Sequence, residues 1–461
     1  MTRRLAMLVL LLALPLLTGG APSPPDLRTE VAKIAGEVLA STRTPAASIA
    51  IVQGGEIVLA EAFGEERIEP RTPARPETRF AIGSISKQFT ASAILLLVEE
   101  KKLSLDDPVA RFLPDLERAK DVRVRDLLAH TSGYQDYWPQ DYVPPFMRSA
   151  IRPTDLVERW AGRGLDFEPG TRYQYSSTGY AIAGLIVEKV TGAPLYSFLE
   201  KRLFAPLGMD GVVDLDRGRP EGCAHGYTRF ALGPLRPAPL EAHGWLFAAG
   251  SLGMRARDLA KWNIGVMEQK VLARSSWAEV ETEARLPNGL GTNYGLGLGM
   301  GRAGERWELE HGGAISGFLA TNRVFPDDRA AVAVLVNDDT GDAASAIADR
   351  IVPLLFERED GKAGSEERAR RVFEDLQRGR IDRALFSENA NAYFTEEALH
   401  DYAASLGKLG APMEVKQTAQ RLRGGMMYRA FNVQTRKKAL EVHERDLPDG
   451  KIEQFIVVGK H

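Results

Sequence analysis

Strand-like segments near both ends of a long helical region constrain the fold of this chain most strongly. Residues 47–63 alternate in polarity around Gly54 and Gly55, which is typical of a β-hairpin. Further strands are expected much later in the chain, at 294–300, 307–311, 318–325 and 330–336. Isolated hairpins are marginally stable in water, so these distant strands must pair to bury their apolar faces. The sequence therefore predicts an α+β domain whose antiparallel sheet is built from both ends and flanked by helices.

Helical patterns fill the space between and around these strands. Apolar residues recur at helical spacing over 28–40 and 342–355. Residues 86–100 are almost wholly apolar after their first turn and contain no Gly or Pro, which predicts a buried helix. The stretch 105–290 alternates helical segments with Pro- and Gly-containing loops, and we interpret it as a helical region inserted into the domain.

A change of composition marks a second domain. We assign residues 22–356 to the first domain and 357–368 to a charged linker that cannot bury enough apolar surface to order itself. Residues 369–461 form a small α+β domain. Its expected elements are two helices and three strands, at 369–385, at 395–406 and within 414–458, where the Pro448–Gly450 segment supplies a turn.

The N-terminus has the pattern of a secretory signal peptide over residues 1–21. Arg3 and Arg4 precede an apolar run from Leu5 to Leu17, and small residues follow up to Ala21. The run is shorter than the ~20 residues needed to span a bilayer, so cleavage is favoured over the alternative of an uncleaved anchor. We expect a periplasmic or secreted protein with no membrane span after cleavage.

Charge and cysteine content exclude several classes of function. With 59 basic and 62 acidic residues the net charge is −3, and no long basic run is present, so nucleic acid is not an expected partner. Cys223 is the single cysteine among 461 residues, which excludes an internal disulfide and a thiolate zinc site. No cofactor is predicted, because Gly299, Gly301 and Gly304 match a dinucleotide motif but precede a strand where that motif needs a helix. No metal is predicted either, because His225 and His243 have no His or carboxylate at metal-ligand spacing.

Ser84 and Lys87 stand at the start of the predicted buried helix. A serine three residues before a lysine places both side chains on one face of a helix, one turn apart. A neutral amine there can take the proton of the hydroxyl, although a lysine normally titrates near ~10.4. Burial and the positive end of the helix dipole would both lower that pKa. The alternative, a polar cap with an exposed lysine, is disfavoured because the apolar run takes Lys87 into the interior.

Five sequence motifs follow one another in a fixed order along the chain. They are 80–90 (FAIGSISKQFT), 126–133 (DLLAHTSG), 167–180 (FEPGTRYQYSSTGY), 249–262 (AGSLGMRARDLAKW) and 311–318 (HGGAISGF). In these motifs the chain resembles the serine β-lactamase and penicillin-binding protein superfamily, in the branch of class C β-lactamases, D-alanyl carboxypeptidases, D-aminopeptidases and esterases. The resemblance covers about residues 45–355.

The resemblance implies roles for individual residues. Ser84 would be the acylated nucleophile, Lys87 its partner base, and Tyr175 a second proton-transfer group whose pKa Lys87 lowers; which of the two is the base stays open. Gly313 would let a strand edge approach the substrate, and the amide N–H groups of Ala314 and Ser84 would form an oxyanion hole. His130 is interpreted as structural, packing a loop beside the site.

Two departures from the family pattern bear on the substrate. Ser177 stands where family members have an asparagine that binds the substrate amide, and a hydroxyl cannot donate and accept in the same fixed plane. His311 replaces the lysine of the Lys-Thr-Gly motif and carries charge only near or below pH ~6.5, so it attracts a substrate carboxylate poorly. Esters and amides without a carboxylate become the better candidates.

The resemblance predicts a serine hydrolase that acts on a small ester, amide or D-peptide and is at most a weak β-lactamase. Peptidoglycan is a further candidate partner. The alternative is a catalytically weak penicilloyl- or cell-wall-binding protein that keeps the hydrolase fold for recognition. The second domain resembles nuclear-transport-factor-2-like and ketosteroid-isomerase-like domains, and we expect it to bind or pack.

Overall fold

The computed structural model describes residues 27–140, 142–304, 306–356, 362–423, 425–448 and 450–459. The predicted signal peptide and residues 357–361 of the predicted linker lie outside these ranges.

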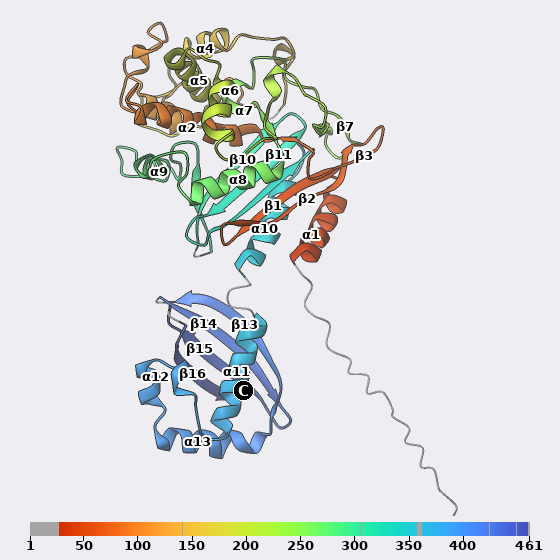
Figure 1. The fold of residues 1–461 in the computed structure, drawn as a ribbon, viewed down its shortest axis with the longest axis vertical. Coiled ribbons are helices and arrows are strands. Elements are labelled where there is room, and N and C mark those ends of the chain that lie inside the picture. The colour runs from red at the N-terminus through yellow and green to blue at the C-terminus, as the bar shows by residue number, and fades with distance from the viewer. Residues whose placement is uncertain are drawn as a thin grey trace, which may run out of the picture.

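A seven-stranded sheet forms the centre of the first domain within the described residues, in the order β3-β2-β1-β12-β11-β10-β9 (Figure 1). Its strands are β1 (Ala46–Gln53), β2 (Glu56–Arg67), β3 (Thr72–Pro73), β9 (Gly299–Ala303), β10 (Arg306–Ile315), β11 (Phe318–Phe325) and β12 (Ala330–Val336). Two smaller sheets join β4 (Phe80–Ala81), β8 (Leu252–Met254) and β5 (Val213–Asp214), and β6 (Tyr227–Thr228) with β7 (Arg236–Pro237).

The predicted sheet built from both ends of the domain is confirmed. β1 pairs antiparallel with β12, in a register that sets Ala47 opposite Val336 and Val52 opposite Ala331. Both strands are buried along almost their whole length, so their backbone N–H and C=O groups need partners in the apolar interior. These partners come from the pairing of β1 with β12 and from their outer neighbours β2 and β11. The hairpin of β1 and β2 is also present as expected.

Helices cover both faces of this sheet. One face packs against α1 (Leu27–Thr42) and α10 (Ala343–Phe356), and the other contributes to the larger core that contains α2 (Ser86–Glu99) and α8 (Ala256–Met267). The remaining helices of this domain are α3 (Val124–Leu128), α4 (Pro153–Ala161), α5 (Ser177–Thr191), α6 (Leu195–Leu199), α7 (Phe247–Gly250) and α9 (Arg274–Val280).

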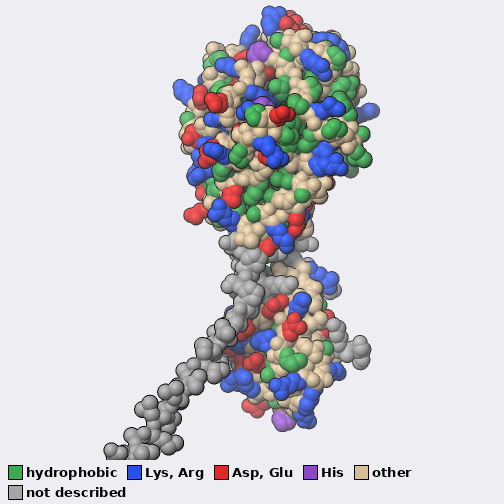
Figure 2. All heavy atoms as spheres, turned by 90° about the vertical axis from the view of Figure 1, so that its right-hand side faces the viewer, with side chains coloured by type: hydrophobic (Ala, Val, Ile, Leu, Met, Phe, Trp, Pro, Cys, Tyr) green, Lys and Arg blue, Asp and Glu red, His purple; other side chains and the backbone are tan. Residues whose placement is uncertain are grey.

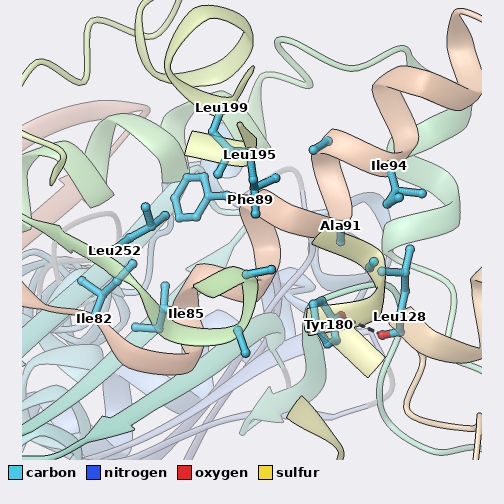
Figure 3. Close-up of a cluster of buried hydrophobic side chains, with 14 of the residues drawn as sticks. Ile82, Ile85, Phe89, Ala91, Ile94, Leu128, Tyr180, Leu195, Leu199 and Leu252 are labelled. Carbon is cyan, nitrogen blue, oxygen red and sulfur yellow. Dashed lines mark hydrogen bonds between the residues drawn. The ribbon is translucent and has the colours of Figure 1, made fainter. Parts of the chain in front are cut away.

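Helix α2 is the buried helix that the apolar run predicts. Every residue from Ser86 to Leu97 is buried, and Figure 3 shows Phe89, Ala91 and Ile94 within a cluster of apolar side chains from several elements. In the same cluster the Tyr180 hydroxyl donates to the carbonyl of Leu128 at 2.7 Å, joining α5 to α3. The packing fixes α2 along its length, and therefore the turn that precedes it.

The prediction of a strand over residues 294–300 is wrong. Most of this segment is a loop, because the amide of Gly295 donates to the carbonyl of Leu298 and Gly297 adopts φ +87°, which no extended strand allows. The strand begins only at Gly299. The loop carries Tyr294 into the interior of the first domain.

The C-terminal part has a core of its own within residues 369–455. Its helices are α11 (Lys362–Gln377), α12 (Glu388–Tyr393) and α13 (Glu396–Leu406), and its sheet joins β13 (Pro412–Arg423), β14 (Met426–Thr435), β15 (Ala439–Asp446) and β16 (Ile452–Gly459) in chain order.

Two expectations for this part need correction. The sheet has four strands among the described residues where the sequence predicts three. Residues 362–368, assigned to the linker, are the first turns of α11, because their polar side chains bind the sheet: Ser365 bonds to Gln417, and Arg368 forms an ion pair with Glu444 at 2.6 Å. A charged segment that satisfies its charges on a neighbouring strand need not stay in solvent.

Basic and acidic side chains are interspersed over the molecular face in Figure 2, as the small net charge leads one to expect. Among the described residues no single helix is long and apolar enough to cross a membrane; the bent pair Ser177–Thr191 and Leu195–Phe204 passes that test by length and composition only.

Candidate active site

A single turn of 3₁₀ helix, Gly83–Ile85, holds Ser84 immediately before α2. Gly83 has φ +50°, and a β-carbon at this position would lie 2.8 Å from the amide nitrogen of Ala314. At Gly313 a β-carbon would lie 1.9 Å from the carbonyl oxygen of Ile82. Two glycines therefore let strand β10 approach the turn that carries Ser84.

Lys87 lies one helical turn beyond Ser84 and is fully buried. Its Nζ is 3.0 Å from Oγ of Ser84 and donates to the carbonyl of Ala249, at the end of α7, at 3.1 Å. Burial lowers the pKa of Lys87 to about 7, and the negative charge of Asp136 opposes this shift. The amine is therefore available in its neutral form near neutral pH, beside the hydroxyl whose proton it would take.

Tyr175 completes the group around Ser84 with its hydroxyl hydrogen-bonded to that of Ser84. Lys87 Nζ lies 4.9 Å from the centre of its ring. The expectation that Lys87 lowers the pKa of Tyr175 is wrong, because burial and the charge of Asp136 raise this pKa above its ordinary value. Tyr175 is therefore a neutral phenol at neutral pH and can donate a proton.

His130 packs against Tyr175, with the ring centres 4.2 Å apart. Its Nδ1 accepts the backbone N–H of Ser176 at 3.0 Å, and burial lowers its pKa. The neutral imidazole thus fixes the segment that carries Tyr175.

His311 on β10 is held in a neutral state by its neighbours. Its Nδ1 lies 2.6 Å from the carbonyl of Gly312, which can only accept, so Nδ1 carries the proton and the Tyr294 hydroxyl donates to Nε2 at 2.9 Å. Burial and the charge of Lys87 lower the pKa of His311 to about 4. The sequence predicts that the Lys-to-His change removes a fixed positive charge. Because of this lowered pKa, His311 is uncharged over a wider pH range than an exposed histidine would be.

Two cavities meet at Ser84. The larger has a volume of about 850 Å³ and the smaller about 580 Å³, and both are lined by Ser84, Tyr175, Ala314 and Leu319. Ser177, at the start of α5, lies on the wall of the larger cavity, and His311 and Gly313 lie on the wall of the smaller one. The structure thus brings together all seven residues that the sequence singles out around one nucleophile.

Asp136 is a site residue that the sequence analysis misses. It lines the larger cavity, and its Oδ1 accepts the backbone N–H groups of Ser177 at 3.0 Å and Trp138 at 3.3 Å. Burial raises its pKa, while Lys87 and these N–H groups act in the opposite direction. A carboxylate three residues after Gly133 of the HTSG segment is the signal that could have revealed it.

Tyr294 is a second omission, because the segment around it was interpreted as a strand. No cluster of three or more His, Cys, Asp or Glu side chains that could hold a metal ion is found in the part of the chain that the structure describes.

The chain is similar to known proteins in sequence and in fold. A D-aminopeptidase of Brucella anthropi is 28% identical over 317 residues, which are 68% of this chain and 59% of that protein. The chain therefore spans well under two thirds of the length of that relative. Among solved structures, the D-amino acid amidase from Ochrobactrum anthropi SV3 aligns with a TM-score of 0.64 and 26% identity, covering 73% of this chain and 100% of the amidase.

The octameric penicillin-binding protein homologue from Pyrococcus abyssi shares the fold, with a TM-score of 0.63 and 23% identity, over 94% of this chain and 99% of its own. The family model named Beta-lactamase matches residues 31–355, which include every site residue described above. The resemblance inferred from the five motifs is confirmed, and the chain belongs to the beta-lactamase family.

Proposed function

We propose that this protein is an exported serine hydrolase that forms an acyl-enzyme on Ser84 and acts on small amides and esters whose acyl group carries a free ammonium, such as D-amino-acyl amides. The observation that carries the substrate class is Asp136, a carboxylate on the wall of the Ser84 cavity. Lys87 is the cation that acts on it, but burial leaves that amine largely uncharged above about pH 7, and within the described residues Asp136 forms no direct ion pair with Lys or Arg. An ammonium beside the scissile carbonyl would supply a counter-ion in direct contact.

The proposed acylation begins with neutral Lys87, which takes the proton of Ser84 as Oγ attacks the carbonyl carbon. The amide N–H groups of Ser84 and Ala314 would stabilise the resulting oxyanion. Tyr175, kept protonated by burial, would pass a proton to the leaving nitrogen and be reprotonated by Lys87. Water then hydrolyses the Ser84 ester by the same route in reverse.

The names of the two similar proteins, a D-aminopeptidase and a D-amino acid amidase, support the D-amino-acyl class. Export rests on the sequence of residues 1–21 alone, and peptidoglycan fragments with a free amine are one natural source of such a substrate. The second domain is proposed to bind or pack and takes no part in the chemistry assigned here.

Replacing Asp136 by Asn should separate recognition of the amine from hydrolysis itself. We expect kcat/KM for D-alanine p-nitroanilide to fall by about tenfold or more, since a charge-assisted hydrogen bond is lost. For p-nitrophenyl acetate, which has no amine, the midpoint of the pH–rate profile should move to lower pH, because the carboxylate that raises the pKa of Lys87 is gone. Initial rates over a pH series measure both effects.

Asp155→Asn is a matched control, because Asp155 is an exposed carboxylate paired with Arg152 on α4. Asp155→Asn should leave kcat/KM unchanged for both substrates. Equal losses on both substrates in Asp136→Asn would contradict the proposed role of Asp136.

Hydrolysis of β-lactams should be slow compared with that of a small activated ester. A penicillin or cephalosporin presents a carboxylate and an acylamide, which this chain meets with neutral His311 and with Ser177. The loss of a charge-assisted contact and part of a neutral one corresponds to about 10² to 10³ in specificity. We expect wild type to favour p-nitrophenyl butyrate over nitrocefin, and the double variant His311→Lys, Ser177→Asn to gain β-lactamase activity.

The exposed His225 offers a control, since His225→Lys adds the same charge away from both cavities. A tenfold preference of wild type for nitrocefin, or no gain in the double variant, would show that these two residues do not set the preference.

A further inference from the structure

The larger cavity extends beyond the space that an amino-acyl group bound to Asp136 needs. Its volume is about 850 Å³, and one part of its wall is formed by Gln135, Trp138, Tyr142, Asp166 and Gln174. We call this part the outer lobe. It lies on the same continuous cavity as Ser84, so a group bound there belongs to the same substrate.

Asp166 in the outer lobe is a positioned carboxylate. Its Oδ1 accepts the side-chain amide of Gln135 at 3.0 Å, and its Oδ2 accepts that of Gln174 at 2.6 Å. The two glutamines come from different loops and fix the carboxylate plane. Because amides are neutral donors, the negative charge is oriented but not neutralised, and no ion pair of Asp166 with a Lys or Arg is recorded within the described ranges.

Two aromatic side chains line the same cavity as Asp166. Trp138 and Tyr142 belong to one loop, in which the Trp138 indole N–H donates to the carbonyl of Tyr142 at 3.1 Å. The faces of such rings attract cations. Among the described lining residues the cavity has three carboxylates, Asp136, Asp166 and Asp339, against one amine, that of Lys87.

The three carboxylates differ in what they are free to do. Asp136 faces Lys87 and the proposed α-ammonium, and Asp339 accepts the backbone N–H of Gly317 in the turn after β10 at 2.8 Å. Within the described residues, the Asp166 carboxylate accepts from the side-chain amides of Gln135 and Gln174 and from no backbone N–H. It is therefore the carboxylate that is left for a second cation.

From this geometry we propose that the outer lobe binds a second positive charge of the substrate, the side-chain ammonium or guanidinium of a basic amino-acyl group. The inference rests on the proposed function for the location of the acyl group, and it names basic D-amino-acyl amides as the preferred substrates.

The test compares D-lysine p-nitroanilide with D-norleucine p-nitroanilide, which share a four-carbon side chain and differ in the terminal ammonium of lysine. Wild type should prefer the lysine substrate by about fivefold in kcat/KM, the size expected of a solvent-accessible ion pair, and the preference should shrink as salt is added. Asp166→Asn should reduce the ratio to about one, and Asp166→Lys should reverse it. Glu168→Gln is the matched control, since Glu168 lies on the same loop but pairs with Arg118 outside the cavity.

A second pair of substrates, p-nitrophenyl hexanoate and p-nitrophenyl 6-aminohexanoate, carries no α-amine and separates this inference from the proposed function. If the D-amino-acyl anilides are inert but the aminohexanoate is preferred in wild type and not in Asp166→Asn, the outer lobe is supported and the D-amino-acyl assignment is overturned. If wild type hydrolyses the anilides or esters without regard to the terminal charge, or if Asp166→Asn keeps the preference, the inference is wrong.

Discussion

Ser84→Ala should lower kcat/KM for every substrate by at least about 10³-fold, because the Ser84 hydroxyl lines both cavities and lies 3.0 Å from the Lys87 amine that can take its proton. A fluorophosphonate probe should label wild type at Ser84, as peptide mass spectrometry would locate, and should not label the variant. The fold should be retained, since Ser84 is only partly buried and the turn around it is fixed by Gly83 and α2.

Ser92→Ala supplies the control. Ser92 lies on the same buried helix, but its hydroxyl donates only to the carbonyl of Gln88, so labelling and turnover should persist. A label on another residue would refute the assignment of the nucleophile. A stoichiometric burst without later turnover would instead favour the alternative of a penicilloyl- or cell-wall-binding protein.

Lys87→Ala should reduce kcat/KM by about 10² or more, and wild-type activity should depend on pH through this same residue. Burial places the pKa of Lys87 at about 7, so the ammonium form, which cannot accept a proton, dominates below that pH. For an ester without an amine, kcat/KM should rise about tenfold per pH unit below 7 and level off above it. For a D-amino-acyl amide a second, falling limb should follow above about pH 8, where the substrate α-amine loses its charge.

Tyr175→Phe provides the comparison within the same proton network. It should also lose about 10² in rate, because the phenol donates to the leaving group, but it should keep the rising limb near pH 7 that Lys87 produces. If Lys87→Ala keeps near-normal rates and a pH–rate profile whose rising limb has the same midpoint as in wild type, another group is the base.

Features carried by local pattern were predictable from the sequence. Each of these features depends on residues that are neighbours in the chain, and the structure contains all of them. They are the helices predicted over 28–40 and 86–100, the hairpin over 47–63 and the contact of Ser84 with Lys87. The sheet from both ends followed because strands with apolar faces need partners.

What escaped prediction depends on residues that meet only in space. Asp136 raises the pKa of Lys87 from a loop that is distant in sequence. Tyr294 donates a hydrogen bond to His311 from a loop segment whose apolar pattern is typical of a strand. The direction of the Tyr175 pKa shift also required the structure, because burial raises this pKa more than the hydrogen bond to Ser84 lowers it. The start of α11 was missed because its charged side chains find their partners on strands that lie much later in the sequence, as in the ion pair of Arg368 with Glu444.

The pairing of β1 with β12 has a consequence for how this protein acquires its structure. Ala47 meets Val336 across the middle of the sheet, so nearly the whole domain must be synthesised before its central hydrogen-bond ladder can form. Until then the inner edge of β1 has no partner, and non-local pairing of this kind makes folding slow and leaves such edges open to association. The entropy lost in closing so long a loop grows only weakly with its length, so the arrangement limits the rate of folding much more than the stability of the folded domain.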